Sequence, residues 1–231
     1  MKPTLIIQDL HIPWMHPDAL AFCKAVQEKY QLDDVISVGD EMDWHSISFH
    51  SHDPDLPSAG DELKMALPML AKWRQAFPKM RLARSNHGDL MRRKMFDAGL
   101  PEAASKVYAE LYQTPGWTWH DEIVENMHGI PLIIRHDFGG NLKSALGKVG
   151  DACIAYGHRH TLFGVHYRAN LRYRQWAMCA GCLIDPGHRA FSYGKGTLDR
   201  PMLGVGIVKD GMATPVPMWT KTSGRWVGKV S

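Results

Sequence analysis

Short apolar runs alternate with a helical pattern at the start of the chain. Residues 5–7 and residues 35–38 are apolar runs of strand length, and each run ends at polar residues. Between them, residues 17–30 repeat apolar positions at helical spacing. The order strand, helix, strand predicts a parallel βαβ unit.

The same alternation continues through the next part of the chain. Residues 44–60 are rich in His, Ser, Asp and Pro, which predicts a long loop, and long loops inside a compact domain are often functional. A helix is expected over residues 63–77, entered near Asp61 and bent or restarted at Pro68. The further expected elements are a strand at residues 80–83 and helices at residues 90–96 and 101–112.

The second half of the chain changes to shorter elements. Strand-like runs occupy residues 123–124, 130–134 and 153–156, with a helix near residues 142–149. From residue 161 onward, short apolar or alternating runs are separated by Gly, Pro and Asp, which predicts antiparallel strands. Because no repeat, low-complexity tract or linker interrupts the chain, we expect one domain over residues 1–231.

Polar residues that can bind a metal ion follow five of the predicted strands. In an open α/β sheet, ligands bind beyond the carboxyl ends of the strands, so these residues are expected to share one edge. Each fragment alone occurs often by chance, and a single histidine is more often a core or surface residue than a ligand. Five fragments in order, each after a strand, predict one site. Its candidate residues are Asp9, His11, Asp40, Asn86, His136, His158 and His160.

The donor atoms of this set favour hard or borderline divalent cations. Carboxylate and amide oxygens together with imidazole nitrogens suit Mn²⁺, Fe or Zn²⁺ rather than soft metals. Seven ligands exceed what one ion needs, whereas two ions that share one carboxylate would use them all. Two ions about 3.5–4 Å apart stabilise the attacking and leaving oxygens of a phosphoryl displacement. We therefore expect two divalent ions, Mn²⁺ first, with Fe, Zn²⁺, Ni²⁺ and Mg²⁺ as alternatives.

The order of these motifs resembles that of the calcineurin-like metallophosphoesterase superfamily. The superfamily pattern is D-x-H, G-D-x-x-D, G-N-H-[D/E], a later His, and G-H-x-H. The matching positions are residues 9–11, 39–43 and 85–88, His136, and residues 157–160. The resemblance covers residues 4–160, and residues 180–186 are similar to the small-residue strand that follows in the superfamily. Residues 39–54 also resemble compact members that bacteriophages often carry.

The resemblance implies a fold and a set of roles. The fold would be α/β, a four-layer αββα sandwich of two mixed sheets flanked by helices. Phosphomonoester or phosphodiester bonds would be hydrolysed by a metal-bridging hydroxide, with His87 protonating the leaving oxygen and Asp43 holding a ligand in place. The implied ligands are Asp9, His11 and His160 for the first ion, Asn86, His136 and His158 for the second, and Asp40 between them.

Two positions beside the predicted catalytic histidine depart from the superfamily pattern. Ser85 stands where a glycine is usual, and Gly88 stands where the pattern has an acid that often orients the catalytic imidazole. Asp89, one position later, would substitute for that acid only through a shifted turn. The departure bears on catalysis more than on metal binding, and a structural role for His87 stays open.

Composition excludes several classes of protein. Hydrophobic residues make up 45% and charged residues 22% of the chain, which excludes intrinsic disorder, and no apolar run approaches the roughly 20 residues of a membrane helix. The four cysteines are too few for a disulfide scaffold, and the C-x-x-C of Cys179 and Cys182 has no second pair to complete a zinc site. Without an export signal, we expect reduced thiols and a cytoplasmic location, in a host cytoplasm if the protein is phage-encoded.

The net charge of +3 is unevenly distributed. Residues 1–150 carry a net charge of −4 and residues 151–231 a net charge of +7. The C-terminal third is therefore a candidate surface for a phosphate-bearing partner, or alternatively a solvated basic face. Arg84 and Arg159, beside the ligand motifs, are the candidate substrate contacts.

These charges favour a nucleotide or a nucleic acid as the substrate. Tyrosines alternate with arginines in residues 166–174, and Trp14 and Trp44 lie beside ligand motifs, where they would stack on a base or wall the cleft. The alternatives are an endo- or exonuclease acting on DNA or RNA, and a non-catalytic metal-binding scaffold of the same fold. No membrane partner is expected, and the sequence does not choose between monoester and diester substrates.

Overall fold

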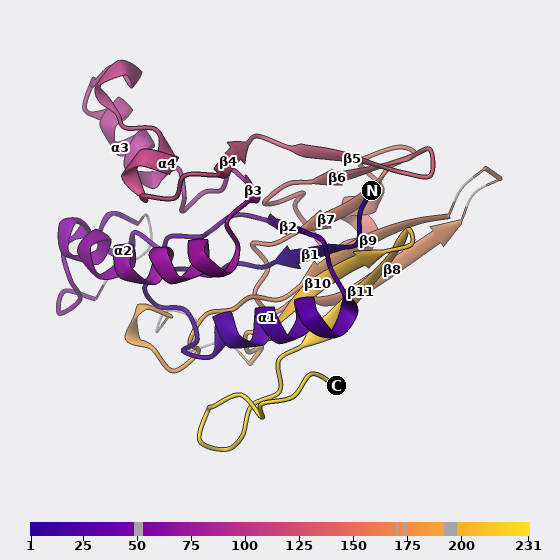
Figure 1. The fold of residues 1–231 in the computed structure, drawn as a ribbon. Helices are drawn as coiled ribbons and strands as arrows, with labels where there is room; N and C mark the ends of the chain where they lie inside the picture. Colours follow the sequence, from indigo (N-terminus) through magenta and orange to yellow (C-terminus); the bar gives the residue numbers. More distant parts are fainter. Residues whose placement is uncertain (49–52, 170, 173, 192–197) are drawn as a thin grey trace.

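In the computed structural model, two β-sheets form the middle of the molecule (Figure 1). The structure describes residues 1–48, 53–169, 171–172, 174–191 and 198–231. The strands of the first sheet, in spatial order, are β11 (Met212–Pro217), β10 (Gly204–Lys209), β1 (Thr4–Ile7), β2 (Asp34–Ser37), β3 (Met80–Ala83) and β4 (Trp117–His120). Strands β1 to β4 are parallel to one another, whereas β10 and β11 are antiparallel to their neighbours.

The second sheet is also mixed. Its strands, in spatial order, are β5 (Ile123–Met127), β6 (Ile130–Ile134), β7 (Cys153–Tyr156), β9 (Arg174–Ala180) and β8 (Phe163–Ala169). Strands β6, β7 and β9 are parallel, and the edge strands β5 and β8 are antiparallel to their neighbours. The pairing of β8 with β9 and of β10 with β11 confirms the antiparallel strands predicted after residue 161.

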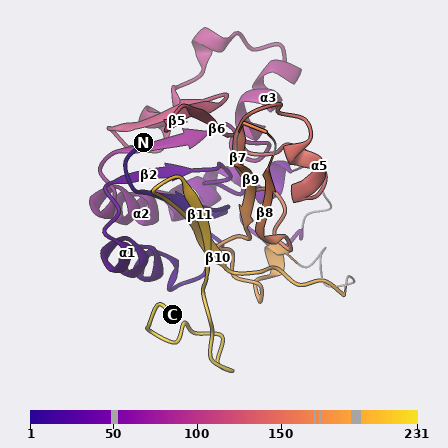
Figure 2. The same cartoon turned by 90° about the vertical axis from the view of Figure 1, so that its right-hand side faces the viewer.

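Alternating side chains along the buried strands divide the core into layers. In β1, Leu5 and Ile7 pack with helices α1 (Ala19–Tyr30) and α2 (Ala59–Ala76), whereas Ile6 packs against the second sheet. In β7, alternate residues face the first sheet or helix α5 (Leu142–Leu146). Figure 2 shows the layers edge-on, with α1 and α2 on one outer side and α5 on the other. The predicted four-layer αββα sandwich is confirmed.

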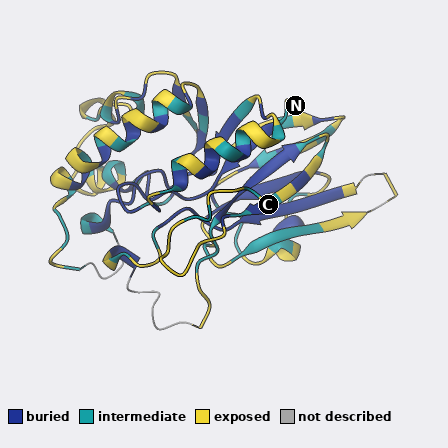
Figure 3. Ribbon diagram, turned by 60° about the horizontal axis from the view of Figure 1, so that its bottom comes forward, coloured by how far each residue is buried: buried dark blue, intermediate teal, exposed yellow. Residues whose placement is uncertain are grey.

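Helix α2 is one continuous helix that contains Pro68, so the helix does not restart at this residue. It begins after Ser58, whose hydroxyl accepts the backbone N–H of Asp61. Ala66 before the proline and Leu70 after it both pack into the core of the first sheet. This burial on both sides offsets the helical hydrogen bond that a proline removes. The exposed outer faces of the helices and the buried strands between them are visible in Figure 3.

The segment between β3 and β4 is less helical than predicted. Helix α3 (Leu90–Asp97) forms as expected, but residues 101–112 divide into a 3-10 turn, η2 (Glu102–Ala104), and a single helical turn, α4 (Tyr108–Leu111). The Ser105 hydroxyl donates to the backbone carbonyl of Glu102 at 2.8 Å, and such local bonds compete with a continuing helix. Strand β4 was not predicted, although its alternating Trp117 and Trp119 are a strand signal.

The cysteines belong to the core. All four are buried and none forms a disulfide. Burial raises the pKa of Cys179 to about 12 and also raises that of Cys182, so neither thiol of the C-x-x-C pair ionises near neutral pH. Within the described ranges, the helices are too short or too polar for any of them to cross a bilayer.

Candidate metal centre

The carboxyl ends of strands from both sheets meet at one edge of the sandwich. The loop residues there adopt an unusual backbone conformation: His11, Asp40 and His158 have φ angles of 51°, 50° and 65°. Residues other than glycine rarely adopt this left-handed conformation, and where they do the position is often functional. The predicted residues at this edge are Asp9 and His11 after β1, Asp40 after β2, Asn86 after β3, His136 after β6, and His158 and His160 after β7.

The Asp40 carboxylate lies between two imidazoles. Its Oδ2 atom is 3.4 Å from Nε2 of His11 and 3.2 Å from Nε2 of His136. The Nε2 atom of His11 is in turn 3.2 Å from Nε2 of His160. Asp40 thus occupies the central position that the superfamily resemblance implies for a shared ligand.

Asp9 is fully buried, and the second sheet comes close to it. Its Oδ2 atom accepts the backbone N–H of His158 at 2.9 Å, and its Oδ1 atom is 3.5 Å from Nδ1 of His136. A Cβ atom at Gly157 would lie 2.5 Å from Oδ1 of Asp9. The absence of a side chain at position 157 therefore lets the loop after β7 approach the carboxylate.

Hydrogen bonds determine which imidazole nitrogens face the centre. Nδ1 of His136 donates to the Val38 carbonyl at 3.0 Å, so a neutral His136 ring presents the lone pair of Nε2 toward Asp40. Nδ1 of His11 likewise donates to Oδ1 of Asp43 at 2.6 Å. A lone pair and a carboxylate oxygen 3.2 Å apart repel each other unless a cation or a proton lies between them. This donor arrangement fits a divalent cation.

Several buried polar atoms at this edge have no hydrogen-bond partner among the described residues. They include Oδ1 of Asp9, Oδ1 of Asn86 and Nε2 of His136. Leaving such an atom unpaired costs about 1–3 kcal/mol, and a bound ion is one way in which proteins compensate for it. The residues present therefore fit metal ions in chemistry as well as in position.

The carboxylates and imidazoles perturb one another. Burial raises the pKa of Asp9 to about 7. Burial alone would lower the pKa of His136, but the adjacent Asp40 raises it to about 9. Burial also opposes ionisation of Asp40, yet His136 and His87 hold the pKa of Asp40 well below its usual range. The cluster thus retains positive charge beside its carboxylates, and a divalent ion supplies such charge.

Two groups of three side chains have ligand atoms that all lie within 4.8 Å of one another. The group of Asp40, His136 and His158 contains residues expected around the second ion. The other group joins His11 with Asp43 and His87, neither of which is an expected ligand. Because Asp43 already accepts a hydrogen bond from Nδ1 of His11, we interpret Asp43 as the residue that orients this imidazole. Both groups are compatible with a dinuclear metal site.

His87 is held by Asp43 and not by an acid at position 88. Its Nδ1 atom donates to the backbone carbonyl of Asp43, and Oδ1 of Asp43 is 3.6 Å from the same nitrogen. The backbone N–H of His87 donates to Oδ1 of Asp40 at 3.1 Å. Asp89 does not replace the missing acid, because its carboxylate accepts a hydrogen bond from Tyr108. The orientation of the His87 ring is therefore independent of the departure at position 88.

The two departures from the superfamily pattern are coupled in the structure. Ser85 Oγ accepts the backbone N–H of Asp40 at 2.8 Å and that of Gly88 at 3.0 Å. A Cβ atom at Gly88 would lie 2.8 Å from this hydroxyl and 3.2 Å from Oε1 of Glu41. The buried Glu41 carboxylate, which accepts from Trp119 Nε1 at 2.9 Å, thus occupies the space beside position 88. Glu41 is not among the residues predicted from the sequence, where its one signal is its place between Asp40 and Asp43.

Two cavities adjoin the cluster, and each contains one predicted substrate contact. Arg159 lies on a cavity of about 260 Å³ together with His87 and several ligand candidates. Arg84 lies on a cavity of about 600 Å³ that also reaches Asn86, His136 and His158. The structure therefore places both arginines beside the proposed centre.

Other residues considered for substrate binding lie elsewhere. Arg168 donates to the carbonyl of Gly150, which precedes β7 and so lies at the opposite end of that strand from His158. Residues 170 and 173 of the same stretch are outside the described residues. Trp14 and Trp44 are buried in the core, where Trp14 stacks on His188 with ring centroids 4.3 Å apart. Neither tryptophan presents an open face to a substrate.

Several solved structures are similar to this chain. An archaeal phosphodiesterase is 14% identical, with a TM-score of 0.47 and coverage of 92% of this chain and 97% of that chain. The Yfce phosphoesterase of E. coli is 12% identical, with a TM-score of 0.48 and coverage of 97% and 96%. The nuclease MPE of Pseudomonas putida is 15% identical, with a TM-score of 0.41 and coverage of 91% and 85%.

The solved structures similar to this chain thus include a phosphodiesterase, a phosphoesterase and a nuclease. The matches to the first two extend over nearly the whole chain. No protein-family model matches the sequence, and no curated protein matches it.

Proposed function

We propose that this protein is a phosphoesterase that uses two divalent metal ions. The proposal is carried by Asp40, whose Oδ2 atom lies within 3.4 Å of Nε2 atoms on both His11 and His136. A carboxylate oxygen this close to two imidazole nitrogens is repelled by their lone pairs unless positive charge lies between them, and two divalent ions that share Asp40 supply such charge. The unpaired Oδ1 atoms of Asp9 and Asn86 at the same edge provide further ligands.

The ligands divide into two sets that share Asp40. Two divalent ions, when bound, provide Lewis acidity at a phosphoryl oxygen and a hydroxide nucleophile near neutral pH. The mixture of oxygen and nitrogen donors favours Mn²⁺, with Fe, Zn²⁺, Ni²⁺ and Mg²⁺ as alternatives. Asp9, His11 and His160 would hold one ion with Asp40, and Asn86, His136 and His158 would hold the other with Asp40.

His87 is the proposed proton donor to the leaving oxygen. Its Nδ1 atom is engaged by the Asp43 carbonyl, which leaves Nε2 as the nitrogen that carries the transferable proton. Burial lowers the pKa of His87, and a lower pKa makes the protonated imidazole a stronger acid. Arg159 and Arg84, on the two adjoining cavities, would bind phosphate oxygens of the substrate.

We assign the substrate to nucleotides or nucleic acids. Guanidinium groups from three separate segments of the chain, Arg84, Arg93 and Arg135, line the larger cavity beside the proposed centre. Guanidinium groups bind phosphate oxygens with two parallel hydrogen bonds, and several phosphates in a row are a property of nucleic acids. The second candidate function, a nuclease, is favoured by these same three arginines.

The test is hydrolysis of bis(p-nitrophenyl) phosphate and of p-nitrophenyl phosphate, each with Mn²⁺ and with EDTA. We expect Mn²⁺-dependent turnover that is lost in Asp40→Asn and reduced about 10²–10⁴-fold in kcat in His87→Ala. The matched control is Asp33→Asn, which changes an exposed carboxylate just before β2, at the opposite end of that strand from Asp40. This variant should retain full activity.

Metal binding and turnover together distinguish an enzyme from a non-catalytic scaffold. Calorimetric titration with Mn²⁺ should show two bound ions in the wild type and a loss of binding in Asp40→Asn. Two bound ions without turnover of either ester would contradict the enzymatic proposal and would indicate a non-catalytic metal-binding scaffold. Faster cleavage of the diester would favour a phosphodiesterase or nuclease over a phosphatase.

A further inference from the structure

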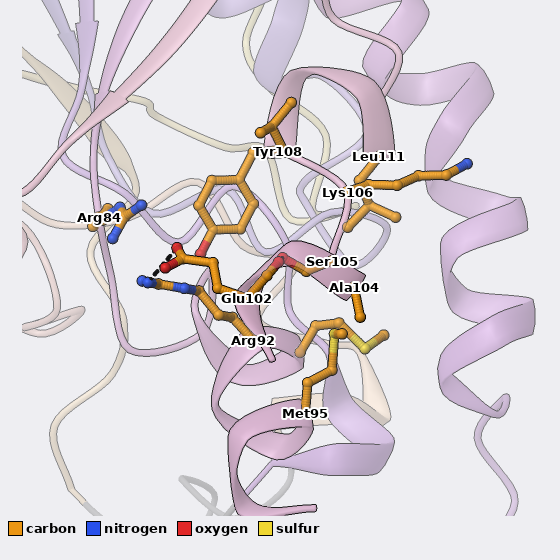
Figure 4. Close-up of a pocket in the computed structure, with 11 residues that line it drawn as sticks. Arg84, Arg92, Met95, Glu102, Ala104, Ser105, Lys106, Tyr108 and Leu111 are labelled. Carbon is orange, nitrogen blue, oxygen red and sulfur yellow. Dashed lines mark hydrogen bonds and ion pairs between the residues drawn. The ribbon is translucent and has the colours of Figure 1, made fainter. Parts of the chain in front are cut away.

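A separate cavity of about 300 Å³ lies in the segment that joins β3 to β4 (Figure 4). This segment contains α3, η2 and α4 and projects from one end of the sheets (Figure 1). The apolar part of the cavity wall comes from Met91 and Met95 on α3 and from Leu111 on α4. No step of the proposed phosphoester hydrolysis uses this cavity.

The cavity wall contains one aromatic side chain with charged groups around it. The half-buried Tyr108 ring forms part of the wall, and the guanidinium of Arg84 lies 5.7 Å from the ring centroid. Nη2 of Arg92 donates to Oε1 of Glu102 at 2.6 Å, so this rim holds hydrogen-bonding groups of both signs. A ring, methionine sulfur atoms and a guanidinium are groups that contact the flat face of an aromatic heterocycle favourably.

Arg84 connects this cavity to the proposed metal centre. It lines both the 300 Å³ cavity and the 600 Å³ cavity that reaches Asn86 and His158. Two more arginines, Arg93 and Arg135, line the larger cavity. The same cavity is also lined by three acids: Asp89 accepts a hydrogen bond from Tyr108, Asp121 lies 3.7 Å from Arg84, and Asp137 lies 3.9 Å from Arg159. Because Arg84 lines both cavities, a strand has a continuous path from the centre to the smaller cavity.

The projecting segment also leaves apolar side chains uncovered among the described residues. Phe96 is 44% exposed, Leu100 is 48% exposed and Val107 is 64% exposed. Val107 lines the cavity itself. Exposed apolar side chains on one projecting segment, one of them in the cavity wall, are more typical of a ligand-binding surface than of an ordinary exposed face.

From these observations, and resting on the proposed phosphoesterase function, we propose that the cavity binds one unpaired base of a single-stranded nucleic acid while a phosphodiester of the same strand lies at the metal centre. The volume of about 300 Å³ is sufficient for one heterocyclic ring system. The apolar wall takes the face of the base, and the Arg92–Glu102 pair lies at its polar edge. The arginines between the two sites take the phosphates.

The test blocks the cavity without touching the metal centre. Ala104 lines the cavity and is exposed, so Ala104→Trp fills the space with a large side chain. Ala103→Trp adds the same side chain to the neighbouring exposed residue of η2 and is the matched control. Binding is measured by fluorescence anisotropy of a labelled thymidine hexanucleotide with protein in EDTA, and hydrolysis by turnover of bis(p-nitrophenyl) phosphate with Mn²⁺.

We expect Ala104→Trp to weaken hexanucleotide binding on the order of tenfold, the usual effect of losing one stacked base, with wild-type turnover of the small diester. A hexanucleotide with one abasic position should show a loss of the same size on the wild type and little further loss on Ala104→Trp. Ala103→Trp should bind like the wild type.

Equal binding of the hexanucleotide by wild type and Ala104→Trp would overturn the base site, as would equal loss in both tryptophan variants. Equal binding of the intact and abasic strands by the wild type would overturn it independently of any variant. The proposed phosphoesterase function fails differently, through absence of Mn²⁺-dependent turnover of the small diester, and base-dependent binding in EDTA is measured separately from that result.

Discussion

Replacing Gly157 with alanine should disturb both the fold and the proposed metal centre. An alanine Cβ would lie 2.5 Å from Oδ1 and 2.9 Å from Oδ2 of Asp9, and 2.5 Å from Cγ2 of Val38. All three distances are shorter than real Cβ contacts, and both neighbours are fully buried. Because the backbone of Gly157 is not left-handed, alanine adds no conformational strain, and the effect comes from steric overlap alone.

The size of the destabilisation follows from the steric overlap and from the burial of the site. Overpacking a buried site costs about 1–3 kcal/mol, and for a chain of this size each kcal/mol lowers Tm by roughly 2–4 °C. We therefore expect the metal-free variant to unfold roughly 2–12 °C below the wild type. Moving Asp9 also breaks its bond from the His158 N–H and should lower Mn²⁺ affinity. Each tenfold loss of affinity removes about 1.4 kcal/mol of stabilisation at saturating metal.

The assay is thermal unfolding in EDTA and in excess Mn²⁺, followed by circular dichroism. The control is Gly60→Ala in α2, where the nearest atom to a new Cβ is Ser58 Oγ at 4.0 Å. This control should be neutral or slightly stabilising, because alanine favours the helix. A Gly157→Ala protein with the wild-type Tm in EDTA and the wild-type Mn²⁺ shift would refute the claim that the loop after β7 sets the position of Asp9.

Two further predictions concern side chains that hold loops in place. Ser85→Ala removes the acceptor of two backbone N–H groups, those of Asp40 and Gly88. It should lower the free energy of unfolding, measured by urea titration, by about 1–3 kcal/mol. Ser85→Thr keeps the hydroxyl and should lose less stability than Ser85→Ala. Asp18 accepts hydrogen bonds from the Arg225 side chain and from Trp226 N–H, which lower its pKa to about 2. A lowered carboxyl pKa adds stability that is present above the ordinary value of 3.8 and is lost as the pH falls through about 2. Asp18→Asn should therefore lower the free energy of unfolding by about 1 kcal/mol at pH 7, a small value because Arg225 is exposed. The loss should be smaller at pH 2.5, and an equal loss at both pH values would contradict this reasoning.

The sequence was sufficient for most of the strands and for the candidate ligands. Apolar runs such as residues 5–7, 80–83 and 153–156 became β1, β3 and β7, because burial of a short run on both faces is a local property. Polar residues directly after those runs were expected at one edge, since parallel strands end on the same side of a sheet. The αββα order of layers came from the resemblance, and the structure confirms it.

Predictions that depended on competition between local and tertiary effects were less successful. Pro68 indicated a break, but packing of α2 on the first sheet keeps one helix. Residues 101–112 indicated one helix, but Ser105 bonds to the backbone and divides it. Trp44 indicated either stacking or a cleft wall, and the core buries it completely.

By itself, the sequence determined which residues could bind metal and which strands would present them, because both depend on residue type and on spacing along the chain. Only the tertiary structure decided how those residues are oriented. The approach of Gly157 to Asp9, the bond from His87 to the Asp43 carbonyl, and the bond from the Asp40 N–H to the Ser85 hydroxyl all join residues that are distant in the sequence. Such contacts depend on how loops from different strands pack together, and packing at a separation of a few ångströms is not encoded in any single segment.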